Sequence, residues 1–128
     1  MKKLSLLIVD DYPDNRLLLV NIANILKHDY KVVENGKEAI EAVKINKFDV
    51  IMMDIEMPVM NGIEATKYIR NEIDGPECNV PIIAITAHNP DDFEDKLRIA
   101  GFTTFISKPY TLDKIRGVLK LVCPDDEY

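Results

Sequence analysis

The chain has 128 residues, of which 47% are hydrophobic and 30% are charged, and its formal net charge is −6. This length suits a single domain over residues 1–128, with a core at about 4–122 and a short tail at 123–128. The acidic balance argues against nucleic acid or an anionic membrane as a main partner, and no apolar run approaches the roughly 20 residues of a membrane helix.

The first strand-like segment covers residues 4–9, which are nearly all apolar, as in a strand buried on both faces. Asp14 or Asn15 is expected to cap a helix that runs to about residue 27. The 3.6-residue spacing predicts that the inner stripe of this helix consists of Leu18, Ile22, Ile25 and Leu26.

Two further strands and a helix follow. Strands are predicted at residues 30–33 and 50–53, and Gly36 opens a helix over residues 37–45 between them. The inward positions of this helix are predicted to be Ala39, Ile40 and Val43. Cys78 and Cys123 lie later in the chain and outside any Cys-x-x-Cys or Cys/His cluster, which argues against zinc and fits a reducing cytoplasm.

The second half continues the alternation of helix and strand. A third helix is predicted from residue 63 to about 73, with Ile63, Ala65 and Ile69 inward, and Gly75-Pro76 ends it. The remaining segments are predicted as a strand at 81–86, a short helix that starts at 89–92 and ends at Gly101, a strand at 102–107, and a helix from the cap Thr111 to Leu121, before a frayed tail. His28 and His88, taken as isolated residues, are expected to be exposed and without a role.

Alternating strands and helices predict βαβ units, hence an α/β fold with a parallel sheet and helices on both faces. In such folds the functional edge lies at the carboxyl ends of the strands. Polar residues stand where the predicted strands end, namely Asp10-Asp11, Asp54, Thr86 and Lys108.

Three carboxylates with one lysine leave an excess negative charge that a divalent cation would neutralise, and without one the carboxylate pKa values should rise. Oxygen ligands without histidine or thiolate favour Mg²⁺ before Mn²⁺. A cation and a lysine beside an aspartate suit phosphoryl transfer with Asp54 as the nucleophile, and the Thr86 hydroxyl is placed to donate to a phosphoryl oxygen.

Over about residues 4–122 the chain resembles the receiver domains of response regulators in two-component and phosphorelay signalling. The resemblance rests on four motifs in order: Leu7-Ile8-Val9-Asp10-Asp11, Met53-Asp54-Ile55-Glu56-Met57-Pro58 with Asn61-Gly62, Ile85-Thr86-Ala87, and Ser107-Lys108-Pro109. It implies a single flavodoxin-like, doubly wound (βα)5 domain with the parallel strand order 2-1-3-4-5.

The resemblance also implies a role for each site residue. Asp54 would accept a phosphoryl group from a phosphohistidine of a sensor histidine kinase or a histidine phosphotransfer protein. Asp11 and Asp54 would bind Mg²⁺ through their side chains, Glu56 through its backbone carbonyl and Asp10 through water. The phosphoryl oxygens would be met by Lys108, Thr86 and the backbone N–H of Ala87.

Further roles concern switching and lifetime. Thr86 and Phe105 would move together when the site is phosphorylated, which would shift the face formed by the fourth helix, fifth strand and fifth helix. Glu56 and His88 are predicted to tune dephosphorylation. Pro109 is predicted to follow a cis peptide bond.

Several alternatives remain open at this point. Asp11-Tyr12-Pro13-Asp14-Asn15-Arg16 and Thr86-Ala87-His88 resemble phosphorelay receivers, either stand-alone or part of a hybrid kinase, although Met1-Lys2-Lys3 favours a natural N-terminus. A downstream protein target is expected, with no direct role for nucleic acid or membrane, as a monomer or a weak dimer through the last helix and strand.

Three rival functions remain. A haloacid-dehalogenase-like phosphatase also uses an aspartate nucleophile, but that residue usually ends the first strand of its fold. A flavodoxin-like nucleotide binder would need a Gly-rich loop where Asp10-Asp11 stands. The third is a receiver fold that has lost the chemistry. The receiver reading predicts no enzymatic activity beyond Mg²⁺-dependent self-phosphorylation and autodephosphorylation.

Overall fold

Five parallel strands form one sheet in the order β2-β1-β3-β4-β5, as the resemblance implied. The computed structural model describes residues 3–87 and 94–124. The strands are β1 (Ser5–Val9), β2 (Asp29–Val33), β3 (Val50–Asp54), β4 (Ile82–Thr86) and β5 (Thr104–Ser107). The helices are α1 (Pro13–Ile25), α2 (Gly36–Ile45), α3 (Gly62–Glu72), the 3-10 turn η1 (Pro76–Asn79), α4 (Glu94–Ala100) and α5 (Leu112–Val122).

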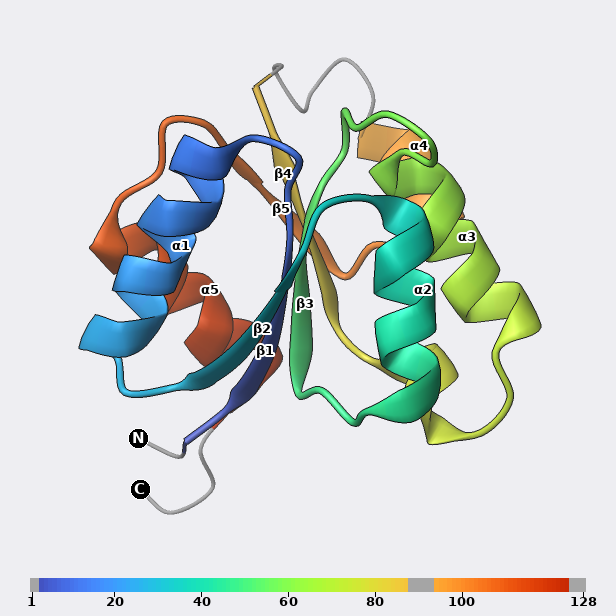
Figure 1. Cartoon of the computed structure of the whole chain (residues 1–128), viewed down its shortest axis with the longest axis horizontal. Coiled ribbons are helices and arrows are strands. Elements are labelled where there is room, and N and C mark those ends of the chain that lie inside the picture. The colour runs from blue at the N-terminus through green and yellow to red at the C-terminus, as the bar shows by residue number, and fades with distance from the viewer. Residues whose placement is uncertain (1–2, 88–93, 125–128) are drawn as a thin grey trace.

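The sheet separates two helical layers. Helices α1 and α5 cover one face, and α2, α3 and α4 cover the other (Figure 1). Alternate residues of β1 face opposite layers: Leu7 and Val9 pack on the side of α2 and α3, whereas Leu6 and Ile8 pack on the side of α1 and α5. Because the side-chain period of a strand is two, both faces of a central strand must be apolar here, which explains its unbroken hydrophobic runs.

The first helix differs from the prediction. It begins at Pro13, preceded by Tyr12, which makes no side-chain cap, and ends at Ile25, so neither Asp14 nor Asn15 caps it. Proline is favoured at a first helical position because its φ is already helical. Of the predicted stripe, only Ile22 is fully buried; Leu18 is 44% exposed and Ile25 61%, while Leu19 and Ala23 point inward instead. Four consecutive apolar residues at 17–20 allow several stripes, and spacing alone cannot choose among them.

The other helices agree more closely. In α2, the predicted Ala39, Ile40 and Val43 are buried, and the Asn35 side chain caps the helix by accepting a hydrogen bond from Glu38 N. In α3, Ala65 and Ile69 are buried, and Asn61 with Glu64 forms a capping box. Thr111 caps α5 as predicted, and Gly101, at φ +110°, follows α4. The predicted start of the fourth helix at 89–92 and the tail beyond 124 lie outside the described residues.

His28 corrects a second prediction, because it is buried and only 4% exposed. It lies just before β2, where its Nδ1 accepts a hydrogen bond from Leu4 N at 3.0 Å. Lys27 precedes it with a φ of +63°, so the chain turns sharply and directs the next side chain inward. Across residues 3–87 and 94–124, no helix has the length and apolar character needed to span a membrane.

Candidate functional site

Three carboxylates meet at the carboxyl edge of β1 and β3. Asp10 and Asp11 directly follow β1, and Asp54 is the last residue of β3. The two strands are neighbours, with Val9 opposite Met53, so the acids come together. Ligand oxygens of Asp10, Asp11 and Asp54 all lie within 4.8 Å of one another. Asp10 and Asp54 are buried, at 0% and 5% exposure, and Asp11 is exposed to solvent.

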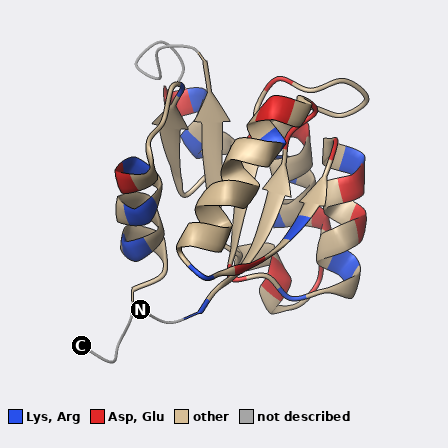
Figure 2. Ribbon diagram, turned by 60° about the vertical axis from the view of Figure 1, so that its left-hand side comes forward, with Lys and Arg blue, Asp and Glu red and all other residues tan. Residues whose placement is uncertain are grey.

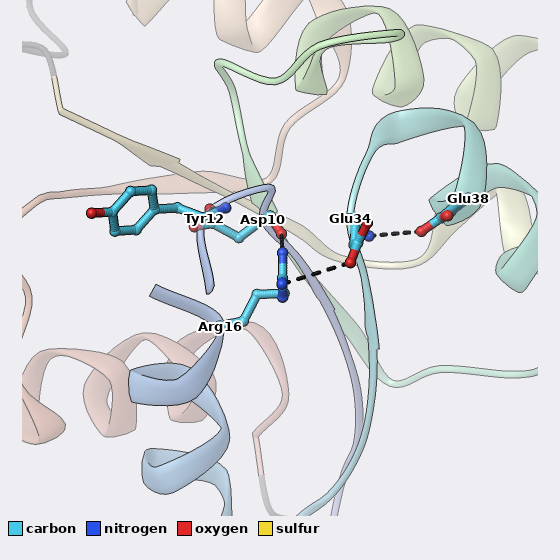
Figure 3. A network of polar contacts seen from close by, with 5 residues as sticks. All are labelled: Asp10, Tyr12, Arg16, Glu34 and Glu38. Atoms are coloured by element: carbon cyan, nitrogen blue, oxygen red, sulfur yellow. Dashed lines mark hydrogen bonds and ion pairs between the residues drawn. The ribbon is translucent and has the colours of Figure 1, made fainter. Parts of the chain in front are cut away.

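The buried Asp10 is held by three hydrogen bonds. Its N–H donates to Val33 O at 3.2 Å, its Oδ1 accepts from Tyr12 N at 2.9 Å, and its carbonyl oxygen accepts from Arg16 Nη1 at 3.0 Å. Figure 3 shows Tyr12 and Arg16 beside Asp10. The remaining oxygen, Oδ2, is buried and makes no hydrogen bond with any described residue.

Lys108 reaches the same cluster from the end of β5. Its Nζ lies 3.6 Å from Asp54 Oδ1 and 3.9 Å from Asp10 Oδ2. Its backbone N–H donates to Thr86 O at 2.7 Å, and the Lys108–Pro109 peptide is cis, as predicted. The lysine therefore faces both buried carboxylates.

Asp54 has a perturbed pKa. Burial raises it from 3.8 to about 6, and the Asp10 carboxylate contributes in the same direction. Lys108 and a hydrogen bond with the Glu56 backbone oppose this effect, and Asp11 adds a smaller increase. Burial and like-charge repulsion together outweigh the lysine.

Of the other predicted residues, Thr86 and Phe105 lie on strands β4 and β5, and Glu56 and Ala87 follow the ends of β3 and β4. Thr86 ends β4 and is 2% exposed, and Ala87 follows it at the surface. Phe105, on β5, is partly buried and packs against the core on the side of α2 and α3. The Glu56 side chain is exposed. His88 lies outside the described residues, so its predicted role is untested.

Tyr110 is a further neighbour of the buried acids that the sequence did not predict. It is 8% exposed, and its hydroxyl is buried without a hydrogen-bond partner among the described residues. Burial, together with the Asp10 and Asp54 carboxylates, raises its pKa to about 12. The only sequence feature that could have pointed to Tyr110 is its position directly after Lys108-Pro109.

The arrangement fits a hard divalent cation. The donors are all carboxylate oxygens, one of them lacks a hydrogen bond, and their mutual repulsion contributes to the raised pKa of Asp54. A cation such as Mg²⁺ satisfies all three conditions, because it prefers oxygen ligands and neutralises clustered carboxylates.

Glycine at position 62 lets the loop after β3 pack closely. A Cβ there would clash with the Asp54 carbonyl oxygen and lie 3.0 Å from Ile55 Cα. The Gly62 N–H donates to Ile55 O at 2.9 Å. Asn61-Gly62 therefore packs α3 against the end of the strand that carries Asp54.

Comparisons with known proteins identify the family. The model of the response regulator receiver domain matches residues 6–120. The sensor protein EvgS of Escherichia coli K12 is 34% identical over 115 residues, which are 90% of this chain and 9% of that protein. The sensor protein GacS of Pseudomonas syringae is 35% identical over 114 residues, covering 88% of this chain and 13% of that protein. The chain thus spans only a small part of these relatives.

Two solved structures are also similar. The receiver domain of a Pseudomonas aeruginosa sensor histidine kinase, with magnesium in its active site cleft, has a TM-score of 0.85 at 27% identity and covers 94% of this chain and 97% of that one. The receiver domain of a Saccharomyces cerevisiae response regulator, crystallised with a histidine phosphotransfer protein, has a TM-score of 0.83 at 30% identity, with 92% and 87% covered. Motifs, strand order and family match agree: this chain belongs to the response regulator receiver domain family.

Proposed function

We propose that Asp54 is a phosphoacceptor that takes a phosphoryl group from a phosphohistidine. The observation that carries this proposal is the buried Asp54 carboxylate at the end of β3, with Lys108 Nζ 3.6 Å from its Oδ1 and two further acids close by. Burying a carboxylate costs free energy unless nearby charges compensate it. Asp54 faces the Lys108 ammonium and belongs to a carboxylate cluster that suits a metal ion.

The transfer needs an ionised Asp54. A carboxylate oxygen attacks phosphorus, the donor's P–N bond breaks, and the electron pair leaves with the imidazole nitrogen. With a pKa of about 6, Asp54 is mostly ionised at pH 7 and above. When bound, Mg²⁺ would supply positive charge to the phosphoryl oxygens, held by Asp11, Asp54, the Glu56 carbonyl and, through water, Asp10.

Lys108, Thr86 and Ala87 are the residues that we assign to the transferred group. The Lys108 ammonium is already at the acceptor oxygen, so it stabilises negative charge as phosphorus approaches. Thr86 ends the strand next to β3, where Asp54 is opposite Ile85. Its hydroxyl and the Ala87 N–H are the donors that we assign to the phosphoryl oxygens.

The switch would run from Thr86 to Phe105. Phe105 pairs with Ala84 across β4 and β5, two positions below the pair of Thr86 and Ser107. It also borders two surface hollows, one beside α4 and one of about 420 Å³ against α5. Phosphorylation adds about −1.5 to −2 charges, which would pull Lys108 and Thr86 inward and let Phe105 follow.

The partners follow from the chemistry and the relatives. A sensor histidine kinase or a histidine phosphotransfer protein would supply the group, and a protein target would read the α4-β5-α5 face. Helix α1 carries only two charged residues, Asp14 and Arg16, both near its start, and the rest of this helix is uncharged (Figure 2). With Leu17 60% exposed and Ile25 61%, α1 offers an apolar surface beside the site for a protein donor. We place the chain in the cytoplasm, as a monomer or weak dimer.

Incubation with acetyl phosphate and Mg²⁺, followed by intact mass measurement, tests the proposal. The wild type should gain one phosphoryl group, Asp54→Asn should gain none, and Asp74→Asn, at an exposed acid on the α3–η1 connection, should behave as wild type. Equal labelling of Asp54→Asn would refute the assignment. Turnover of a generic phosphomonoester would instead support a haloacid-dehalogenase-like phosphatase.

A further inference from the structure

Arg16 ties the first metal-site loop to a second loop. Its Nη1 donates to the Asp10 carbonyl oxygen at 3.0 Å, and its Nη2 lies 3.6 Å from Glu34 Oε1. Figure 3 shows the guanidinium between Asp10 and Glu34. The Glu34 N–H in turn donates to Glu38 Oε1 at 2.8 Å, which fixes the chain between β2 and α2. The Arg16 side chain is 20% exposed and its hydrogen bond to the Asp10 carbonyl is partly buried, whereas the Glu34 side chain is 64% exposed, so the ion pair lies at the surface.

The bonded carbonyl belongs to the peptide that joins Asp10 to Asp11. A peptide unit is planar, so fixing its oxygen fixes the direction in which the chain enters Asp11. The Asp10 side chain is separately bound by Tyr12 N, and the Asp10 N–H by Val33 O. Arg16 is therefore the side chain that holds the oxygen of this peptide, which leads into the exposed Asp11.

We propose that Arg16 is a positioning residue that holds the Asp10–Asp11 peptide so that the Asp11 carboxylate is preorganised for a divalent cation. This inference rests on the proposed function, because it concerns the same metal site. Groups that orient a metal ligand without touching the metal commonly change metal affinity 10–100-fold when they are removed.

The role is geometric and not one of charge. Glu34 lies within ion-pair distance and offsets the positive charge of Arg16, so the pair contributes little net field at the carboxylates. A planar guanidinium can donate to a carbonyl oxygen and contact a carboxylate at the same time. The single ammonium group of lysine does this less well. The two roles differ in salt dependence, because a charge effect is screened and a fixed peptide orientation is not.

The test compares Arg16→Gln and Arg16→Lys with wild type. The matched control is Arg116→Gln, which removes an arginine whose Nη1 pairs with Asp113 on α5. Mg²⁺ dissociation constants are measured by calorimetry at about 0.05 and 0.5 M salt. Amide hydrogen exchange of Asp11 and Tyr12 is followed without metal, and urea unfolding gives the stability of each variant.

Arg16→Gln should bind Mg²⁺ roughly tenfold more weakly, by the same factor at both salt concentrations, with faster Tyr12 amide exchange in the metal-free protein. Arg16→Lys should recover part of the affinity, and Arg116→Gln should match wild type. Wild-type Mg²⁺ affinity and exchange in Arg16→Gln, or a defect that disappears at high salt, would overturn the positioning role while leaving the proposed function intact. Failure of wild type to bind Mg²⁺ would instead overturn the metal site itself. If Arg16→Gln does not fold, Arg16→Lys decides, because it keeps the charge. Weaker Mg²⁺ binding than wild type supports the positioning role, and wild-type affinity overturns it.

Discussion

Lys108 Nζ lies 3.6 Å from Asp54 Oδ1, so the acceptor carboxylate faces a cation from a strand that is not its neighbour in the sheet. The same ammonium is 3.9 Å from Asp10 Oδ2. One lysine thus faces two buried acids and cannot neutralise both. The raised pKa of Asp54 is the consequence of this imbalance together with burial.

Removing the lysine charge should therefore raise the pKa of Asp54 further. In Lys108→Met, carboxyl NMR titration without metal should place the Asp54 pKa above its wild-type value of about 6. Asp10→Asn should lower it, because the like charge that raises it is gone. An unchanged pKa in both variants would show that burial alone sets the value.

The same pKa predicts how acid affects metal-free stability. Because the folded-state pKa is raised from 3.8 to about 6, the Asp54 proton stabilises the fold below pH 3.8, and this contribution is lost as the pH rises through 6. Asp54→Asn should therefore unfold at higher urea concentration than wild type at pH 8 with a chelator, by about 1–3 kcal/mol. The difference in unfolding free energy between Asp54→Asn and wild type should become smaller towards pH 4 and when Mg²⁺ is added. A difference that does not depend on pH would contradict the prediction.

His28 predicts the opposite pH dependence. Burial lowers its pKa below 6.5, against smaller raising effects of Asp49 and Asp29. A depressed folded-state pKa gives stability that is present above pH 6.5 and lost as the pH falls below it. His28→Asn keeps an acceptor for the Leu4 N–H but does not titrate, so its stability should change less between pH 7.5 and 5.5. His28 and His28→Asn are both measured in the Asp54→Asn background, because this removes the opposite pH dependence of Asp54. The same change of stability with pH in the two proteins would contradict the prediction.

Val59 is predicted to be a site of backbone strain. It is β-branched, has a φ of +69° and is 78% exposed, so little packing offsets its conformation. The neighbouring Met60 N–H donates to Pro58 O at 2.7 Å, which closes a tight turn around it. Val59→Gly should stabilise the protein by about 1 kcal/mol in urea unfolding.

The matched control for Val59 is Ile45→Gly. Ile45 is equally exposed, at 77%, but is the last residue of helix α2, where glycine is unfavourable. This control should destabilise the protein. Destabilisation by both substitutions would show that the Val59 conformation carries no strain.

Glu56 is expected to act on the lifetime of the phosphorylated state. Its side chain is exposed two residues after Asp54, where it can accept a proton from an attacking water. Glu56→Asn should lengthen the half-life of the acyl phosphate about two- to tenfold, with little change in the rate of labelling by acetyl phosphate. The measurement is loss of the phosphoryl mass after removal of the donor; His88→Ala is the companion variant, and unchanged half-lives in both would reject the tuning role.

The local pattern was enough to predict most of the fold. Each of β1, β3 and β4 contains an unbroken apolar run with a polar residue at or directly after its end, and such runs belong to central strands of a parallel sheet. The stripe of α1 was wrong because residues 17–20 are all apolar, so the packing partners decided which of them turned inward. His28 was misplaced because no periodic pattern marks a single buried imidazole.

The sequence by itself determined the alternation of strands and helices, the acids and lysine at the strand ends, and the family to which the motifs point. These are local properties, because side-chain period and turn residues are encoded by neighbours in the chain. Tertiary structure alone decided the distances within the site, the raised pKa of Asp54, the place of Tyr110 and the contact of Arg16 with Asp10. Each of these depends on burial and on residues brought together from different strands and loops. Neither burial nor such long-range contacts can be read from any one segment of the sequence.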